Sequence, residues 1–325
     1  MKKGRNYSIE LLRIVLMYAM CIEHSISQGG FYRPGLDHVL DVAVDAFMFI
    51  SGYYGMKFRL KKIGNMICLA IWCAFVLNFA RIFVIGDRTF GALISSSTYT
   101  IAHSTGWWFF WSYLVVMCLS PLVEMAFVAM QEKHLSLKEN LIVVLPILSL
   151  CFGWNYLTIV PVVKDFIPAP LGFGNLSFLT LFGVYVFART YRMCQWERFL
   201  TKKVMLILMP TMAIFVWLGS WHHNSIPQLL LATTVFHLFS AFSLSSRLNK
   251  VVAFVAPSMF AVYLLHVSGV GYFVVGKFNT FLITGIHIPV YLAYFLAGTG
   301  VFIICAAVDA IRRTVLGLLI RRLKR

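Results

Sequence analysis

The chain has 325 residues, of which 60% are hydrophobic and only 12% are charged, whereas soluble globular proteins average about 25% charged residues. This composition excludes a large soluble domain and favours a polytopic membrane protein. The net charge of +16 would suit a nucleic-acid-binding protein, but the placement of the charges along the chain, described below, argues against that class.

The first predicted membrane helix, residues 7–28, carries titratable side chains inside an apolar run. Glu10 lies three residues before Arg13, so the two side chains share a face and can pair. Arg13 and His24 are eleven residues apart, which returns almost to the same helix face and separates them by roughly 16 Å along the axis. A charge at mid-bilayer costs from about 2.5 to more than 10 kcal/mol, so we expect these groups to face a partner or a cavity.

Each of these residues also has a purely structural interpretation. Arg13 alone could snorkel to the membrane interface, and His24 alone could be a hydrogen-bonded interior group. Glu23 projects about 100° away from His24 around the helix, so we do not predict it to be the partner of that imidazole.

The second predicted helix, residues 40–57, contains Asp45, an acid that needs a partner inside an apolar segment. Ser51 and Gly52 follow on the same helix, and small residues of this kind are typical of close helix packing rather than of catalysis. The basic cluster after this helix is interpreted as a topology anchor that could also contact donor phosphates; it comprises Lys57, Arg59, Lys61 and Lys62.

Later segments add two candidate regions. The fourth segment begins with Trp107, Trp108 and Trp111, which indicates either an interfacial belt or a stacking platform for sugar rings. In the ninth segment, His266 lies past the middle of an apolar run and is either a site residue or a structural one. The ten segments predicted to span the membrane are 7–28, 40–57, 63–85, 106–130, 139–157, 172–190, 203–221, 227–245, 252–275 and 288–309.

An even number of spans places both termini on the same side. If that side is the cytoplasm, 22 of the 28 Lys and Arg residues lie on the cytoplasmic side, which is a strong positive-inside pattern. This pattern explains the high net charge as membrane topology and gives no reason to expect nucleic acid as a partner. The basic residues on the outer side are Arg33, Arg88, Lys164 and Lys277.

Three motifs in this order resemble those of membrane acyltransferase family 3. The first is Arg-x10-His at Arg13 and His24, preceded by Arg5 and Glu10 in the arrangement basic-x4-acidic-x2-Arg. The second is VDAFMFISGY at 44–53, similar to V-D-x-F-F-x-x-S-G-[FY], and the third is YLLH at 263–266, similar to Y-L-x-H. Glu10 replaces the commoner Asp and Met48 replaces the second Phe, and neither change removes chemistry.

The resemblance implies an all-α integral membrane protein, a bundle of about ten transmembrane helices formed by a single domain over residues 1–325. It further implies an O-acetyltransferase of the bacterial inner membrane that transfers acetyl from acetyl-CoA to a cell-surface or exported polysaccharide. His24 would be the base and Arg13 would engage the donor. The supporting residues would be Glu10, Arg5, Asp45, Ser51 and His266, with donor contacts from Arg59, Lys61 and Lys62 and acceptor contacts from Trp108 and Trp111.

The expected partners are therefore an acyl-CoA donor as co-substrate, a glycan acceptor and the lipid bilayer, with no bound cofactor and no metal. The seven cysteines lie mostly in apolar segments without CxxC spacing, which is typical of buried hydrophobic residues. Two other classes stay open on the sequence: a transporter or flippase of a glycan or lipid-linked precursor, and a membrane sensor or scaffold. Direct transfer and transfer through a covalent imidazole intermediate also stay open.

Overall fold

The structure, a computed structural model, describes residues 6–29, 35–85, 96–97, 100–101, 105–157, 178–219 and 225–323. All regular structure in these ranges is helical, and they contain no β-strand. The chain divides into two compact units. Unit 1 comprises Met1–Leu40, Gly64–Trp107 and Ser243–Arg325, and unit 2 comprises Asp41–Ile63 and Trp108–Phe242.

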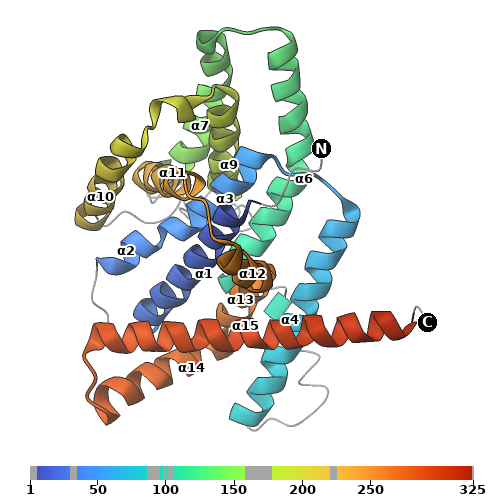
Figure 1. The fold of residues 1–325 in the computed structure, drawn as a ribbon, viewed down its shortest axis with the longest axis vertical. Helices are drawn as coiled ribbons and strands as arrows, with labels where there is room; N and C mark the ends of the chain where they lie inside the picture. The colour runs from blue at the N-terminus through green and yellow to red at the C-terminus, as the bar shows by residue number, and fades with distance from the viewer. Residues whose placement is uncertain are drawn as a thin grey trace. The chain divides into compact units, whose positions relative to one another are not determined.

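Unit 1 is organised around α1, which packs along α15 and also contacts α12, α13 and α14 (Figure 1). The side chain of Asn6 caps the start of α1 by accepting hydrogen bonds from the backbone N–H groups of Ser8 and Ile9. Gly298 of α15 allows the close approach, because a Cβ there would lie 2.9 Å from Cα of Ile22. The helices of this unit are α1 (Tyr7–Ser27), α2 (Leu36–Leu40), most of α4 (Leu60–Ile85), η1 (Thr105–Trp107), α12 (Ser246–Val255), η5 (Ala256–Ser258), α13 (Met259–His266), α14 (Gly269–Thr280), η6 (Phe281–Gly285) and α15 (Val290–Leu323).

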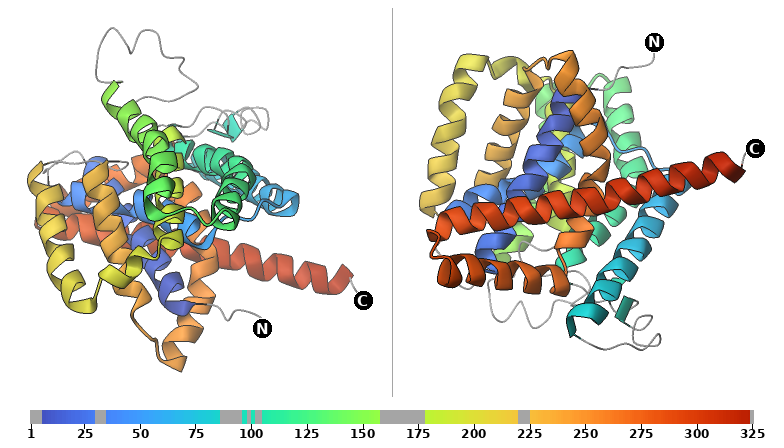
Figure 2. Two further views of the ribbon diagram at one scale, coloured as in Figure 1. Left: turned by 90° about the horizontal axis from the view of Figure 1, so that it is seen from above. Right: turned by 60° about the horizontal axis from the view of Figure 1, so that its bottom comes forward.

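The prediction of one continuous helix over 252–275 was wrong, because the helix ends at His266. Val267 leaves the helical conformation with ψ +64°, and Ser268 is extended and caps α14, its hydroxyl accepting from the N–H of Gly271 at 3.1 Å. The apolar pattern continues across this break, so hydrophobicity alone did not reveal it. His266 is therefore the last residue of α13, and α14 returns alongside α15 (Figure 2).

A buried charged cluster joins α15 to α12 in unit 1. Asp309 is fully buried and binds Arg312 and Arg313 one turn later, at 2.6 and 3.0 Å. Arg313 also donates to the carbonyl oxygen of Phe254 and to the hydroxyl of Ser258, each at 2.9 Å. The cluster compensates a carboxylate that would be costly alone in an apolar helix.

Unit 2 is organised around α9, which contacts α3, α6 and α7 (Figure 1). Gly52 of α3 marks the closest contact, because a Cβ there would lie 2.5 Å from the carbonyl oxygen of Tyr185 on α9. This contact is the packing role predicted for the Ser51-Gly52 pair. The helices of the unit are α3 (Val42–Tyr54), α6 (Trp108–Glu132), α7 (Leu137–Leu157), α9 (Phe178–Met193), η4 (Trp196–Phe199), α10 (Lys202–Gly219) and α11 (Ile226–Ser240).

Four helical stretches in the described residues are long and apolar enough to cross a membrane, and each overlaps one of the ten predicted segments. Helix α1 has sufficient length, but it carries Glu10, Arg13 and Glu23. The count of ten spans and the cytoplasmic location of both termini remain predictions. The four stretches are Leu60–Ile82, Trp108–Glu132, Ser246–His266 and Val290–Leu319.

Candidate active site

Two histidines meet inside unit 1. His24 lies in the last turn of α1 and His266 ends α13, and Nδ1 of His24 is 2.9 Å from Nε2 of His266. The residues are separated by 242 positions in the sequence. His266 is 2% exposed, and 16% of the His24 side chain is exposed, so the pair is largely shielded from solvent. The structure thus brings together two of the residues that the motifs singled out.

The hydrogen-bond partners determine where the protons lie. Nδ1 of His266 is 2.7 Å from the carbonyl oxygen of Val262, which can only accept, so this nitrogen carries the proton. Nε2 of neutral His266 is then an acceptor, and His24 must donate to it through Nδ1–H. The lone pair of neutral His24 is left on Nε2, which is the nitrogen available for acid–base chemistry.

The carboxylate of Glu23 faces this same nitrogen, with Oε2 3.2 Å from Nε2 of His24. The prediction that Glu23 is not a partner of His24 was therefore wrong. A helical wheel places the two Cα–Cβ bonds about 100° apart, but the longer Glu side chain reaches around the helix to the ring. A carboxylate at this position would stabilise a proton on Nε2 of His24.

The end of α13 is held in place by its neighbours in unit 1. Nε1 of Trp107 donates to the carbonyl oxygen of Leu264 at 3.1 Å. The hydroxyl of Tyr263 donates to the carbonyl oxygen of Gly106 at 2.8 Å. Trp107 is fully buried, so this member of the tryptophan-rich stretch is part of the core rather than of an interfacial belt. These bonds fix the backbone that positions His266.

Arg13 and Glu10 form the predicted pair on α1, with Nη1 of Arg13 3.2 Å from Oε1 of Glu10. The side chain of Arg13 is 36% exposed and that of Glu10 is 17% exposed, so the guanidinium is partly accessible at the surface. Arg5, predicted to support this pair, lies outside the described residues. The structure does not bring Arg13 to His24, which lies roughly 16 Å further along the helix axis.

The remaining predicted site residues belong to unit 2. Asp45 is fully buried in α3. The hydroxyl of Ser51 donates to the carbonyl oxygen of Phe47 at 3.0 Å and lies 3.4 Å from the hydroxyl of Tyr113. The intrahelical bond of Ser51 and the close packing of Gly52 support the structural interpretation of that pair.

The predicted donor and acceptor contacts lie on the surface of unit 2. Arg59, Lys61 and Lys62 are exposed, and the ammonium of Lys62 lies 5.7 Å from the ring centre of Tyr113. Trp111 is 42% exposed and Trp108 is half-buried. These positions leave the side chains accessible to ligands, and the roles predicted for them stay predictions.

Sequence reasoning missed a network of charged pairs at the end of α9. Two N–H groups of Arg189 bind Oε2 of Glu124 at 2.7 and 3.1 Å, and the hydroxyl of Tyr185 donates to Oε1 of Glu124 at 3.0 Å. Glu124 in an apolar helix was the available signal, but its partner lies 65 residues away along the chain. A single sequence does not identify a partner at that distance.

A second pair follows one turn later, where Arg192 binds Glu197 at 2.5 Å and the hydroxyl of Tyr53 at 2.9 Å. Partial burial lowers the pKa of the Arg192 guanidinium, but the adjacent Tyr53 and Glu197 outweigh burial and raise that pKa above its ordinary value. Arg192 therefore stays charged. Among the described residues, no group of three His, Cys, Asp or Glu side chains is placed to hold a metal ion.

Comparison with known proteins gives one match. The sequence model of a family described as "Acyltransferase domain" matches residues 6–309, which include Arg13, His24 and His266. The chain belongs to membrane acyltransferase family 3. Its membership makes the protein a membrane acyltransferase, in agreement with the apolar helices of both units. No curated protein and no solved structure matches the chain.

Proposed function

We propose that this acyltransferase transfers an acetyl group from acetyl-CoA to a hydroxyl of a cell-surface or exported polysaccharide, in the inner membrane of a bacterium. The observation that carries the proposal is the hydrogen-bonded chain from Val262 through His266 to His24. It fixes the tautomer of His24 and leaves Nε2 to exchange a proton. Family membership supplies the reaction class.

The reaction needs a base because a sugar hydroxyl is a poor nucleophile. In the proposed step, Nε2 of His24 takes the hydroxyl proton while the oxygen attacks the thioester carbonyl carbon. The new C–O bond forms, the C–S bond breaks, and the departing thiolate takes the proton back from Nε2. General-base assistance of this kind contributes about 10²–10⁴ in rate. His266 acts as the acceptor that keeps Nδ1 of His24 protonated throughout.

Glu23 has two effects in this scheme. Its carboxyl group occupies the position from which a hydroxyl must approach Nε2, so the acceptor has to replace it there. Once His24 has taken the proton, a carboxylate nearby stabilises the imidazolium. Glu23 is thus a positioning residue that controls when the base is accessible.

Arg13 is proposed to engage the donor from the cytoplasmic side, where acetyl-CoA is made. A guanidinium stays charged and can donate hydrogen bonds to the phosphates or to the pantetheine arm of the donor, and Glu10 orients it at 3.2 Å. This role rests on the predicted orientation of α1, with Arg13 in the inner half of the membrane and His24 in the outer half.

The first experiment is to measure the O-acetyl content of surface glycan in cells that carry wild type, His24→Ala or Arg13→Ala at matched protein levels. We expect both variants to lose O-acetyl groups while the amount of glycan is unchanged. His134→Asn is the matched control, because it removes an exposed imidazole in a turn with φ +50°, a conformation that Asn tolerates.

A different result would redirect the proposal. Persistent acetylation in both variants with reduced glycan export would favour the transporter or flippase considered from the sequence. Persistent acetylation with unchanged export would leave His24 and Arg13 without a chemical role and would contradict the mechanism.

A further inference from the structure

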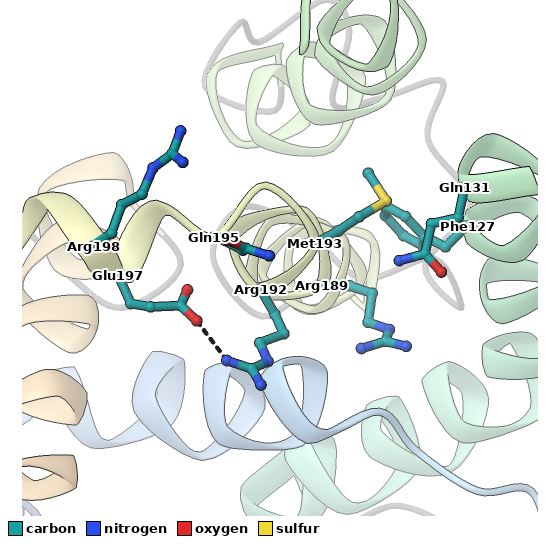
Figure 3. A pocket seen from close by; sticks show the side chains of 8 residues that line it. All are labelled: Phe127, Gln131, Arg189, Arg192, Met193, Gln195, Glu197 and Arg198. Atoms are coloured by element: carbon teal, nitrogen blue, oxygen red, sulfur yellow. Dashed lines mark hydrogen bonds and ion pairs between the residues drawn. The ribbon is translucent and has the colours of Figure 1, made fainter. Parts of the chain in front are cut away.

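Unit 2 contains a cavity of about 370 Å³ at the end of α9, which lies towards the lower end of the roughly 300–1,000 Å³ range of small-molecule pockets. Figure 3 shows that its wall comes from α6 on one side and from α9 with η4 on the other. Three arginines and one glutamate give this wall a positive balance, and Phe127 and Met193 add an apolar face. The lining residues are Phe127, Gln131, Arg189, Arg192, Met193, Gln195, Glu197 and Arg198.

Two of the three arginines are held in position before any ligand binds. Glu124 holds Arg189, and Glu197 with the ring of Tyr53 holds Arg192, whose guanidinium lies 5.0 Å from the ring centre. Each guanidinium has more N–H donors than these bonds use. Little side-chain entropy is therefore lost when a phosphate binds, which favours affinity.

Arg198 differs from the other two arginines. Within the described part of the chain no carboxylate lies within ion-pair distance of it, and its guanidinium stacks on the ring of Phe199 at 4.9 Å. In Figure 3 its side chain extends away from those of Arg189 and Arg192. The cavity thus offers cations at separate positions, which suits a ligand with more than one phosphate group.

The cavity also offers a hydrogen-bond acceptor. Oε2 of Glu197 is buried and makes no hydrogen bond to the described residues, whereas Oε1 binds Arg192. A buried acceptor of this kind is satisfied by a hydroxyl or amino group of a ligand. A phosphorylated nucleoside supplies such a group from its ribose or its base.

The segments next to the cavity are predicted to lie on the cytoplasmic side, from which the donor is proposed to bind. A Cβ on Gly55, which follows α3, would lie 3.7 Å from the guanidinium carbon of Arg189, so the segment leading to Arg59, Lys61 and Lys62 starts beside the cavity wall. The positive-inside pattern predicts that Arg189, Arg192 and Arg198 face the cytoplasm.

We infer that this cavity binds the phosphorylated nucleoside end of the acyl-CoA donor, an inference that rests on the function proposed above. The 3′-phosphate and the 5′-diphosphate would bind the separate arginines. The base would pack on Phe127 and Met193, and Glu197 would accept a hydrogen bond from the nucleoside. The cavity takes only this end of the donor and leaves the pantetheine arm free to extend.

The test measures equilibrium binding of CoA and of adenosine 3′,5′-bisphosphate to the full chain in phosphatidylcholine nanodiscs. The variants are Arg198→Gln and the double variant Arg192→Gln/Glu197→Gln, which removes the guanidinium without changing the net charge. Arg247→Gln is the matched control, since it removes the same charge from an exposed position in unit 1 on the same predicted side. We expect each pocket variant to weaken binding about tenfold or more, and Arg247→Gln to leave it unchanged.

The outcomes separate this inference from the proposed function. His24→Ala should bind both probes like wild type while losing transfer, because the cavity does not include His24. Unchanged binding in the pocket variants would overturn the cavity assignment, even if His24→Ala abolishes transfer. Conversely, weaker binding in the pocket variants with full transfer by His24→Ala would contradict the proposed mechanism and leave the cavity assignment standing.

A lipid headgroup is the other source of a phosphate with neighbouring hydroxyl groups. Nanodiscs that contain phosphatidylglycerol provide that arm of the experiment. If the variants lose affinity for phosphatidylglycerol but not for either nucleotide probe, the cavity is a lipid site and the inference is wrong. If CoA and adenosine 3′,5′-bisphosphate bind with the same affinity in both kinds of nanodisc, the donor assignment holds.

Discussion

The end of α1 and the end of α9 satisfy their polar side chains in different ways. At the end of α1, His24 and His266 are joined by hydrogen bonds between groups that can be neutral, and Asn279 binds Ser25 nearby at 2.9 Å. At the end of α9, carboxylates hold Arg189 and Arg192 as fixed charges. The first arrangement lets a proton change position, and the second presents cations that cannot lose theirs. The difference supports the proposed roles, which are proton transfer at the end of α1 and anion binding at the end of α9.

The largest expected effect tests whether the two histidines act as one group. His24→Ala should lower turnover about 10²–10⁴-fold, and the double variant His24→Ala/His266→Ala should be no slower than His24→Ala alone. The reason is that, in the proposed mechanism, His266 acts only through His24. Turnover is measured with purified protein, acetyl-CoA and a glycan acceptor. Multiplicative losses in the double variant would show that His266 has a separate function.

A smaller effect is expected for Glu23→Gln. An amide can donate to Nε2 of His24 but carries no negative charge to stabilise the imidazolium, so turnover should fall about tenfold to a hundredfold. The Michaelis constant for the donor should be unchanged, because Glu23 belongs to unit 1 and acts on the base. A raised donor constant with normal turnover would contradict the role given to Glu23.

The smallest expected effect is in unit 2, where Glu124→Gln removes the carboxylate that holds Arg189 and Tyr185. Both side chains of the ion pair are about a quarter exposed, so the free energy of unfolding should fall by only about 1 kcal/mol. Thermal unfolding in detergent measures the change, and turnover at saturating donor should stay near that of wild type. A loss of turnover with unchanged stability would break the division of roles between the two regions.

Much of the first helix was predictable from local spacing. The pairing of Glu10 with Arg13 followed from their separation and is confirmed. The packing role of Gly52 was likewise expected from residue size, and the contact with Tyr185 bears it out. In both cases the physics is confined to one helix or to the volume of one residue, which a single sequence expresses directly.

Long-range partners were not predictable. The His24–His266 bond depends on where α13 ends, and the apolar pattern conceals the break at Val267 and Ser268. Glu23 was missed because a helical wheel treats side chains as radial and ignores the reach of a flexible one. The pairing of Glu124 with Arg189 joins two helices, and nothing within either segment specifies the other.

Helix α15 is longer than the bilayer core requires. The charged cluster in its second half bears on how the helix can adjust to the thickness of a membrane. Its 34 residues span about 51 Å, whereas the stretch from Val290 to Asp309 alone covers about 30 Å, the thickness of the hydrocarbon. The cluster of Asp309 with Arg312 and Arg313 would have to lose its hydration if the helix slid inwards. We therefore expect α15 to adjust to a thinner membrane by tilting rather than by moving along its axis.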